Sequence, residues 1–330
     1  MKLVKLVNAR AGEALAMLRA MRRVATLDGT KPLTGPSRSS LQGVSRYAFG
    51  LKGEVDVDGL ASIAPAELAA ALPDPALAEW AARFLAVTAL VDGALDGGKI
   101  ALVLDYAAAL RVREGYLAQL GAAARGNLDW ALADMTRQNV KSLWDRPWRD
   151  DEDIMALILP YKGDRADPAL VARHEALGSL PPGTFGRAYW EIYKKNGYAF
   201  PGDPNGVNAA FARPHDSTHV LSGYDTTPQG EILVSTFTAG MHPKLPLEGH
   251  ILPVIFSWHL GIEINEFAGS ARGALDPEKF WVAWARGAAV SADLFAPEWD
   301  FWSVAGEPVE SVRKRYHVPA LDPRHAAGGH

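Results

Sequence analysis

The chain reads Pro214-His215-Asp216-Ser217-Thr218-His219, and Gly230-Glu231 follows shortly afterwards. Residues four apart lie on one face of an α-helix, so His215 and His219 are expected to point the same way. Two neutral imidazoles at this spacing are able to share one divalent metal ion. A Glu from the next element would complete a His/His/carboxylate set. This stretch predicts two helices joined by a short loop, with a metal site between them.

The residues around the motif agree with that interpretation. Pro214 suits the first position of a helix, where a missing N–H does no harm. Gly223 suits a left-handed helix end, and Thr227-Pro228 suits the start of the next helix. Glu231 would then lie in the first turn of that second helix, within reach of the histidines.

Helical spacing of apolar residues recurs along the rest of the chain, whereas alternating strand patterns are scarce. Residues 31–40 have the composition of a polar turn, and a charged segment at 145–153 suits a boundary or domain contact. We therefore expect an all-α, bundle-like fold, and the length allows two helical domains. The expected helices cover residues 10–25, 65–72, 77–91, 99–116, 184–195, 231–239, 251–268, 277–294 and 308–316.

Composition excludes several classes of function. The 34 basic and 38 acidic residues give a net charge of −4, which argues against nucleic acid as a partner. Cysteine is absent, so a zinc site would have to use nitrogen and oxygen ligands. No apolar run reaches the roughly 20 residues of a membrane-spanning helix, and the start does not read as a secretory signal. We expect a cytoplasmic protein that is able to touch a membrane surface.

Bland readings compete with the metal site. Asp216 and Glu231 each suit the first turn of a helix, where a carboxylate stabilises the helix dipole. In zinc peptidases a Glu follows the first His, whereas Asp216 stands there in this chain, so peptide hydrolysis is disfavoured. An HD-type phosphohydrolase would use His215-Asp216 with an upstream His and a downstream Asp, for which His174 and Asp225 are candidates.

A second pair of ligand-capable side chains, His259 and Glu263, is also four residues apart. Because Trp258, Leu260 and Ile262 flank them, we expect a structural role in a buried helix. The remaining histidines are interpreted as ordinary surface or core residues.

The pattern His-Asp-x-x-His-(eleven residues)-Glu resembles the signature of the fourth coenzyme Q biosynthesis protein family. Two flanking segments agree in order: 180–189, Leu-Pro-Pro-Gly-Thr-Phe-Gly-Arg-Ala-Tyr, and 308–316, Pro-Val-Glu-Ser-Val-Arg-Lys-Arg-Tyr, the latter preceded by Glu298-Trp299-Asp300. The segment 211–214 differs from the family's usual lead-in, and Met241-His242-Pro243 differs from its expected helix.

The resemblance implies an α-helical protein of ubiquinone biosynthesis that binds zinc or a similar divalent ion. His215, Asp216, His219 and Glu231 would be its ligands and its catalytic groups. Arg187 and Tyr189, on the matched segment, are expected to contact substrate. The implied activity is that of a carboxy-lyase that decarboxylates a polyprenylated hydroxybenzoate precursor. The alternatives are a non-catalytic, isoprenoid-lipid-binding scaffold of a biosynthetic complex and the HD-type phosphohydrolase. Expected partners are the isoprenoid lipid, other quinone-biosynthesis proteins, a second copy in a homodimer, and a membrane surface.

The N-terminal third resembles, in its two Asp-Gly helix ends at 28–29 and 92–93, the helical domains of TerB-like tellurite-resistance proteins. Asp-Gly after an apolar helix is also a common stop, and two ordinary helix ends are the favoured interpretation. The expected organisation is a helical N-terminal domain at 1–120, a ubiquinone-biosynthesis-type metal domain at 121–320 and a disordered tail at 321–330.

Overall fold

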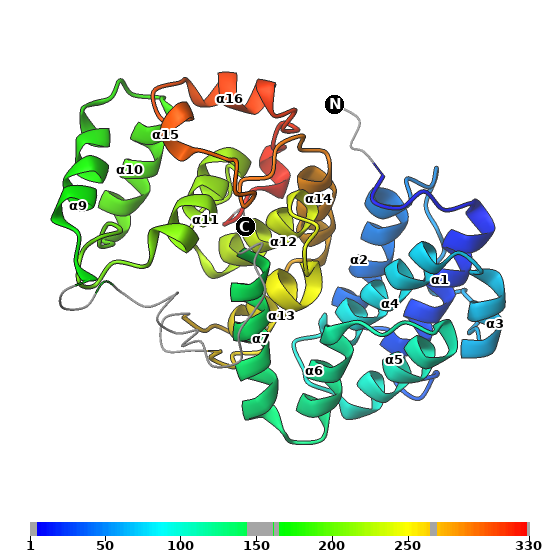
Figure 1. The fold of residues 1–330 in the computed structure, drawn as a ribbon. Coiled ribbons are helices and arrows are strands. Elements are labelled where there is room, and N and C mark those ends of the chain that lie inside the picture. The colour runs from blue at the N-terminus through cyan, green and yellow to red at the C-terminus, as the bar shows by residue number, and fades with distance from the viewer. Residues whose placement is uncertain (1–4, 144–160, 162–164, 265–268, 329–330) are drawn as a thin grey trace.

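The protein is all-α in the computed structural model, which describes residues 5–143, 161, 165–264 and 269–328 (Figure 1). Within these ranges the extended pairing is limited to two isolated bridges, Thr184 with Pro308 and Leu260 with Arg272. The fold class expected from the helical periodicity is confirmed.

The N-terminal helices form one side of the molecule around a large apolar cluster (Figure 1). Buried residues of α1 such as Leu18 and Met21 meet Phe84 and Leu85 of α4 in this cluster. Burial of such side chains is the main favourable contribution to folding. The elements are α1 Ala11–Ala25, α2 Gly35–Gly43, η1 Val44–Ala48, α3 Pro65–Ala71, α4 Pro75–Leu90, α5 Gly97–Leu110 and α6 Gly115–Ala124.

The C-terminal helices surround a second apolar cluster that is rich in aromatic rings, including Phe185, Tyr189, Tyr193 and Phe301. Tyr193 stacks on Phe200 with ring centroids 4.6 Å apart. The elements are α7 Leu128–Leu143, α9 Pro168–Glu175, η3 Ala176–Ser179, α10 Phe185–Asn196, α11 Ala209–Ser222, α12 Pro228–Met241, η4 Pro246–Ile251, α13 Leu252–Trp258, α14 Pro277–Ala288, α15 Phe301–Val304, α16 Val309–Arg315 and η5 Pro323–His325.

Helices α12 and α14 join the two clusters and lie between them in Figure 1. Ile232 of α12 packs into the first cluster, whereas Phe237 of the same helix packs into the second. The two helices approach closely at Gly287, where a Cβ atom would stand 2.0 Å from the carbonyl oxygen of Phe237. Only glycine allows this contact, so α12 is fixed rigidly against α14.

Several boundaries differ from the expected ones. Residues 35–40, predicted as a turn, start α2, because Thr34 caps it by accepting a hydrogen bond from Ser37 N. The helix predicted over 99–116 ends at Leu110, because Arg111 adopts a left-handed conformation and α6 begins at Gly115. The helix predicted over 251–268 ends at Trp258, and its last residues, like the charged segment 145–153, fall outside the described ranges.

The predicted division into domains stays a prediction. Its boundary at 120/121 falls within α6, and the N-terminal cluster takes in residues of α12, α13 and α14. The described part of the tail packs on the body: Leu321 lies against the C-terminal cluster, and Gly328 N donates to Gln229.

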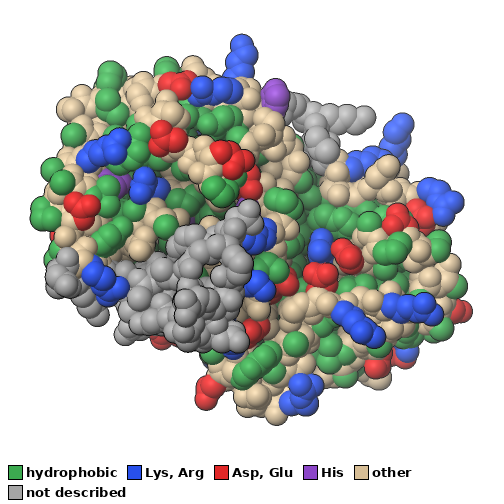
Figure 2. All heavy atoms as spheres, in the orientation of Figure 1, with side chains coloured by type: hydrophobic (Ala, Val, Ile, Leu, Met, Phe, Trp, Pro, Cys, Tyr) green, Lys and Arg blue, Asp and Glu red, His purple; other side chains and the backbone are tan. Residues whose placement is uncertain are grey.

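Acidic and basic side chains are interspersed on the face shown in Figure 2, in line with the small net charge. Among the described helices none combines the length and the hydropathy that crossing a bilayer requires.

Candidate metal centre

The helix that carries the motif begins earlier than predicted. Asn208 caps α11 by accepting a hydrogen bond of 2.9 Å from Ala210 N, and Pro214 lies inside the helix. The prediction that Pro214 opens the helix was wrong, because an effective cap upstream supplies a start. Pro214 tolerates an interior position only by leaving one helical N–H bond unmade. The other signals were correct: Gly223 ends α11 with φ of 81°, and Thr227 caps α12 by accepting from Gly230 N.

The two histidines and the glutamate converge. His215 Nε2 lies 3.4 Å from Glu231 Oε2, and His219 Nε2 lies 3.5 Å from Glu231 Oε1. The two imidazole rings meet edge to face, with centroids 5.2 Å apart. The side chain of His219 is 2% exposed, whereas those of His215 and Glu231 are each 18% exposed, so the cluster is reached from one side.

Asp216 joins the cluster from the same helix. Ligand-capable atoms of His215, Asp216 and His219 all lie within 4.8 Å of one another. Tyr193 on α10 donates its hydroxyl proton to Asp216 Oδ2 at 2.5 Å, and Tyr189 donates to Tyr193 at 2.9 Å. One carboxylate oxygen is thereby held by a buried chain of hydroxyls, and the other is left for a further partner.

The histidine beside Glu231 is oriented by the backbone. His219 Nδ1 lies 3.1 Å from the carbonyl oxygen of Tyr224, so it donates there, and Nε2 faces Glu231. A histidine that binds metal through one nitrogen commonly donates its other N–H to a carbonyl or carboxylate, which fixes the tautomer. His219 has this arrangement.

Electrostatics couple the groups. Burial by itself would lower the pKa of His219, but the Glu231 carboxylate outweighs it and raises the pKa to about 9. Burial raises the pKa of Asp216, with the nearby histidines acting in the opposite direction. Burial opposes ionisation of Glu231 as well, yet its pKa falls well below the usual range, because His219 and His215 stabilise the carboxylate. The centre thus gathers acidic charge that a cation would neutralise.

The donor set fits a divalent ion. It offers two imidazole nitrogens and two carboxylates, without thiolates, which is a combination that zinc accepts. Glu231 contacts both histidines at distances that leave their lone pairs directed at a common region. His215, His219, Asp216 and Glu231 would hold the ion.

A cavity of about 450 Å³ opens beside this centre. His215, Asp216 and Glu231 line it at one end. Its other walls are mostly apolar and aromatic, a typical lining for small-molecule sites. Apolar lining residues include Phe211, Pro253, Val254, Trp258, Ile264 and Phe295.

The other candidates from the sequence take different places. Tyr189 is fully buried and reaches the centre only through Tyr193. Arg187 donates to the Gly178 carbonyl oxygen and to Glu191, and it does not line the cavity. Their contact with substrate stays a prediction. His259 bonds to Val91 O and accepts from Leu275 N, which is the structural role expected for it.

Sequence reasoning missed Tyr193. The signal was present in principle, because Tyr193 follows Tyr189 by four residues and so lies on the same face of α10. Nothing in the sequence, however, indicated that this face would pack against Asp216.

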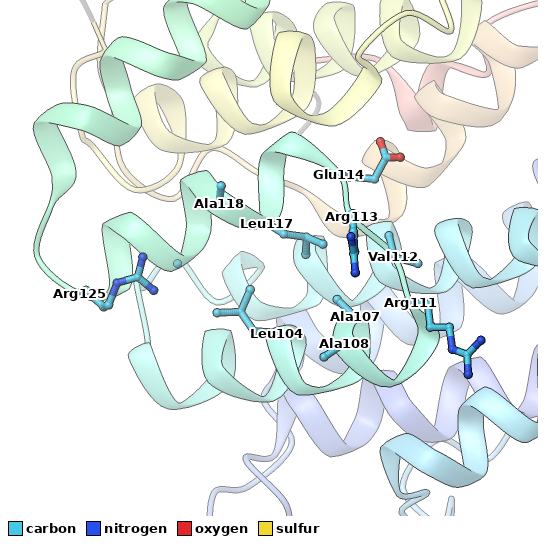
Figure 3. Close-up of a pocket in the computed structure, with 11 residues that line it drawn as sticks. Leu104, Ala107, Ala108, Arg111, Val112, Arg113, Glu114, Leu117, Ala118 and Arg125 are labelled. Atoms are coloured by element: carbon cyan, nitrogen blue, oxygen red, sulfur yellow. The ribbon is translucent and has the colours of Figure 1, made fainter.

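A second hollow, of about 760 Å³, lies between α5 and α6, far along the chain from the motif. Figure 3 shows apolar side chains such as Leu104 and Leu117 there, together with Arg111, Arg113 and Arg125. Glu114 is its one carboxylate among the described lining residues, so this hollow lacks the donor set of a metal centre.

Comparison with known proteins gives little. The chain matches no family model and no curated protein. Among solved structures it aligns with the crystal structure, at 2.85 Å, of a protein from Nostoc punctiforme PCC 73102 that bears the name "putative ubiquinone biosynthesis protein". The alignment covers 62% of this chain and 95% of that one, with 20% identity and a TM-score of 0.32.

Proposed function

We propose that this chain is a metal-dependent enzyme of ubiquinone biosynthesis that decarboxylates a polyprenylated hydroxybenzoate precursor, with zinc the expected ion. The observation that carries the proposal is the convergence of His215, Asp216, His219 and Glu231 at the end of an apolar cavity. The resemblance of the His-Asp-x-x-His…Glu pattern to the coenzyme Q family supports the choice of reaction.

The bound ion would act as a Lewis acid that polarises an oxygen of the substrate. The chain itself supplies the surroundings of the reaction. The apolar walls keep water from the ring, and Trp258, Val254 and Ile264 provide surface for a prenyl chain. Exclusion of water strengthens the electrostatic interactions within the cavity.

Decarboxylation breaks the bond between a ring carbon and the carboxyl carbon. The electron pair stays on the ring carbon, which must take up a proton as carbon dioxide leaves. The hydrogen bond between Tyr193 and Asp216 holds a proton at the cavity wall, since both residues line it. Burial raises the pKa of both groups, so each retains its proton more readily than in water. This pair is our candidate for the proton source.

The alternative function is a scaffold that binds isoprenoid lipid without catalysis, and the apolar lining of the cavity favours it equally. A phosphohydrolase has no comparable support. The described cavity lining contains no Lys or Arg to bind phosphate. His174 is enclosed by the rings of Tyr189, Phe200 and Trp302, and Asp225 accepts hydrogen bonds from Thr227.

Elemental analysis of the purified protein, combined with a decarboxylation assay, tests the proposal. The assay measures release of carbon dioxide from farnesylated para-hydroxybenzoate by wild type, His219→Gln and Glu231→Gln, with His325→Gln at the surface as the control. We expect one divalent ion per chain and turnover in wild type and control. Both site variants should lose turnover by at least a hundredfold.

Two outcomes would decide against the enzyme. A chain that carries metal and binds the lipid without releasing carbon dioxide is the scaffold. A chain that binds no divalent ion, or whose site variants turn over normally, has no metal-dependent activity at this centre.

A further inference from the structure

The cavity continues beyond the metal centre along one face of α12. Glu231, Ser235 and Thr238 follow one another at intervals of four and three residues, and all three line the cavity. At 1.5 Å per residue, Thr238 lies about 10 Å along the helix axis from Glu231. A ligand held at the metal centre would therefore meet a second set of side chains about two helical turns away.

Thr238 has an unusual environment for a buried helical threonine. Its Oγ1 is inaccessible and has no hydrogen-bond partner within the described residues. Buried helical threonines elsewhere in this chain donate to the carbonyl four residues earlier. Thr236 does so to Ile232 at 2.7 Å and Thr218 to Pro214 at 2.8 Å. The hydroxyl of Thr238 does not make this local bond.

His250, on η4, lines the same cavity and is also without a partner. It is 5% exposed, and neither ring nitrogen is hydrogen-bonded to any residue that the structure describes. Its neighbour His242 differs, because both nitrogens of that ring are engaged, by Asp293 at 2.7 Å and Ser142 O at 3.0 Å. Burial lowers the pKa of His250 to about 3, so the ring is neutral and offers one donor and one acceptor.

Unpaired polar groups in a protein interior are destabilising by about 1–3 kcal/mol each. Two of them on one cavity indicate that something other than the folded chain supplies their partners. Because the imidazole is uncharged, the partner it suits is a neutral hydroxyl or carbonyl rather than an anion. Phe295 packs against this ring, with centroids 5.7 Å apart, so the surroundings suit a flat, apolar group.

We propose that His250 and Thr238 form a second binding point, which accepts the hydroxyl or carbonyl oxygen at the far end of an aromatic acid whose carboxylate reaches the metal centre. This rests on the proposed function and specifies its substrate as a para-oxygenated benzoate. A benzene ring with polar groups at opposite ends, extended by one coordination bond and one hydrogen bond, spans a length comparable to the interval from Glu231 to Thr238.

The test compares two probes: farnesylated para-hydroxybenzoate and the same benzoate lacking the hydroxyl. Calorimetry gives the Kd of each for zinc-loaded wild type, His250→Phe, Thr238→Val and Thr236→Val. We expect wild type to prefer the hydroxylated probe by tenfold or more, because the other leaves the polar groups unpaired. His250→Phe and Thr238→Val should reduce this preference to less than threefold and bind the other probe at least as tightly. Thr236→Val, whose hydroxyl is bonded within its helix, should keep the preference.

Thermal unfolding gives a second measurement that does not depend on the probes. Thr238→Val and His250→Phe should be at least as stable as wild type, since each removes an unpaired polar group, whereas Thr236→Val should unfold at a lower temperature. A loss of stability in Thr238→Val would show that its hydroxyl is bonded in the folded chain and would overturn the inference.

The outcomes separate this inference from the proposed function. If wild type binds both probes and His250→Phe and Thr238→Val keep its preference, the two groups hold only water and the inference fails, while the metal-dependent function stands. If wild type binds neither probe, both fail. If His250→Phe does not fold, Thr238→Val decides by itself.

Discussion

The hydroxyl of Tyr193 on α10 donates a hydrogen bond of 2.5 Å to Oδ2 of Asp216 on α11. Through this bond, the aromatic cluster of the C-terminal half positions a carboxylate of the candidate metal centre. Partners of this kind commonly set the orientation and basicity of the groups that bind a metal.

Replacing Tyr193 by Phe should therefore weaken zinc binding by about 10- to 100-fold, since Asp216 loses the donor that orients it. The stacking on Phe200 is kept, so the fold should persist. Competition against a chromogenic chelator measures the change. Tyr189→Phe is the matched control, because it removes only the bond to Tyr193, and it should have a smaller effect. Equal effects of the two variants would contradict a direct role for Tyr193.

Zinc binding should tighten as the pH rises from about 6.5 to 9. In the metal-free chain His219 keeps its proton up to a pKa of about 9, because Glu231 outweighs the effect of burial. A metal ion must displace this proton, so binding releases it. Calorimetry in buffers of different ionisation enthalpy counts the released protons. The expected count at pH 7.5 is close to one, and Glu231→Gln should reduce it.

The same shift affects the stability of the metal-free protein in the opposite direction. A raised pKa of His219 in the folded state stabilises the fold fully below the unfolded value near 6.5. This contribution is lost as the pH rises towards 9. Metal-free protein should therefore lose stability between pH 6.5 and 9, and zinc should reverse the loss. Chemical unfolding with and without a chelator measures both.

Acid should destabilise the protein through His174. This residue is fully buried, and desolvation lowers its pKa to about 4. Below pH 6.5 the unfolded chain takes up a proton there that the folded chain refuses, so stability falls between pH 6.5 and 4. His174→Phe should remove a slope of about 1.4 kcal/mol per pH unit in that range. Urea unfolding at several pH values measures it; an unchanged slope would mean that His174 is protonated in the folded state.

Gly287→Ala should destabilise the protein by about 2–4 kcal/mol, since overpacking at a rigid backbone contact cannot relax. The new Cβ would stand 2.0 Å from the carbonyl oxygen of Phe237, where α12 meets α14. Gly12→Ala is the matched control, because nothing lies within 4 Å of a Cβ atom there, and it should be neutral or slightly stabilising. Urea unfolding compares the two, and similar behaviour would show that α12 and α14 are free to separate.

The sequence by itself determined the local parts of this protein. Four-residue spacing placed His215 and His219 together, Gly223 ended one helix, and Thr227 started the next, so Glu231 fell in its first turn. Each of these features depends on backbone geometry within a few residues, which periodicity and capping residues encode.

Tertiary packing alone decided the rest. Tyr193 reaches Asp216 across two helices, and His250 enters the cavity of Thr238 from η4, because the packing of two apolar clusters against α12 brings these residues together. No local pattern specifies such contacts. They arise from the fit of side chains that are distant in the sequence, as does the start of α11 at Ala209, ahead of a proline that local rules place first.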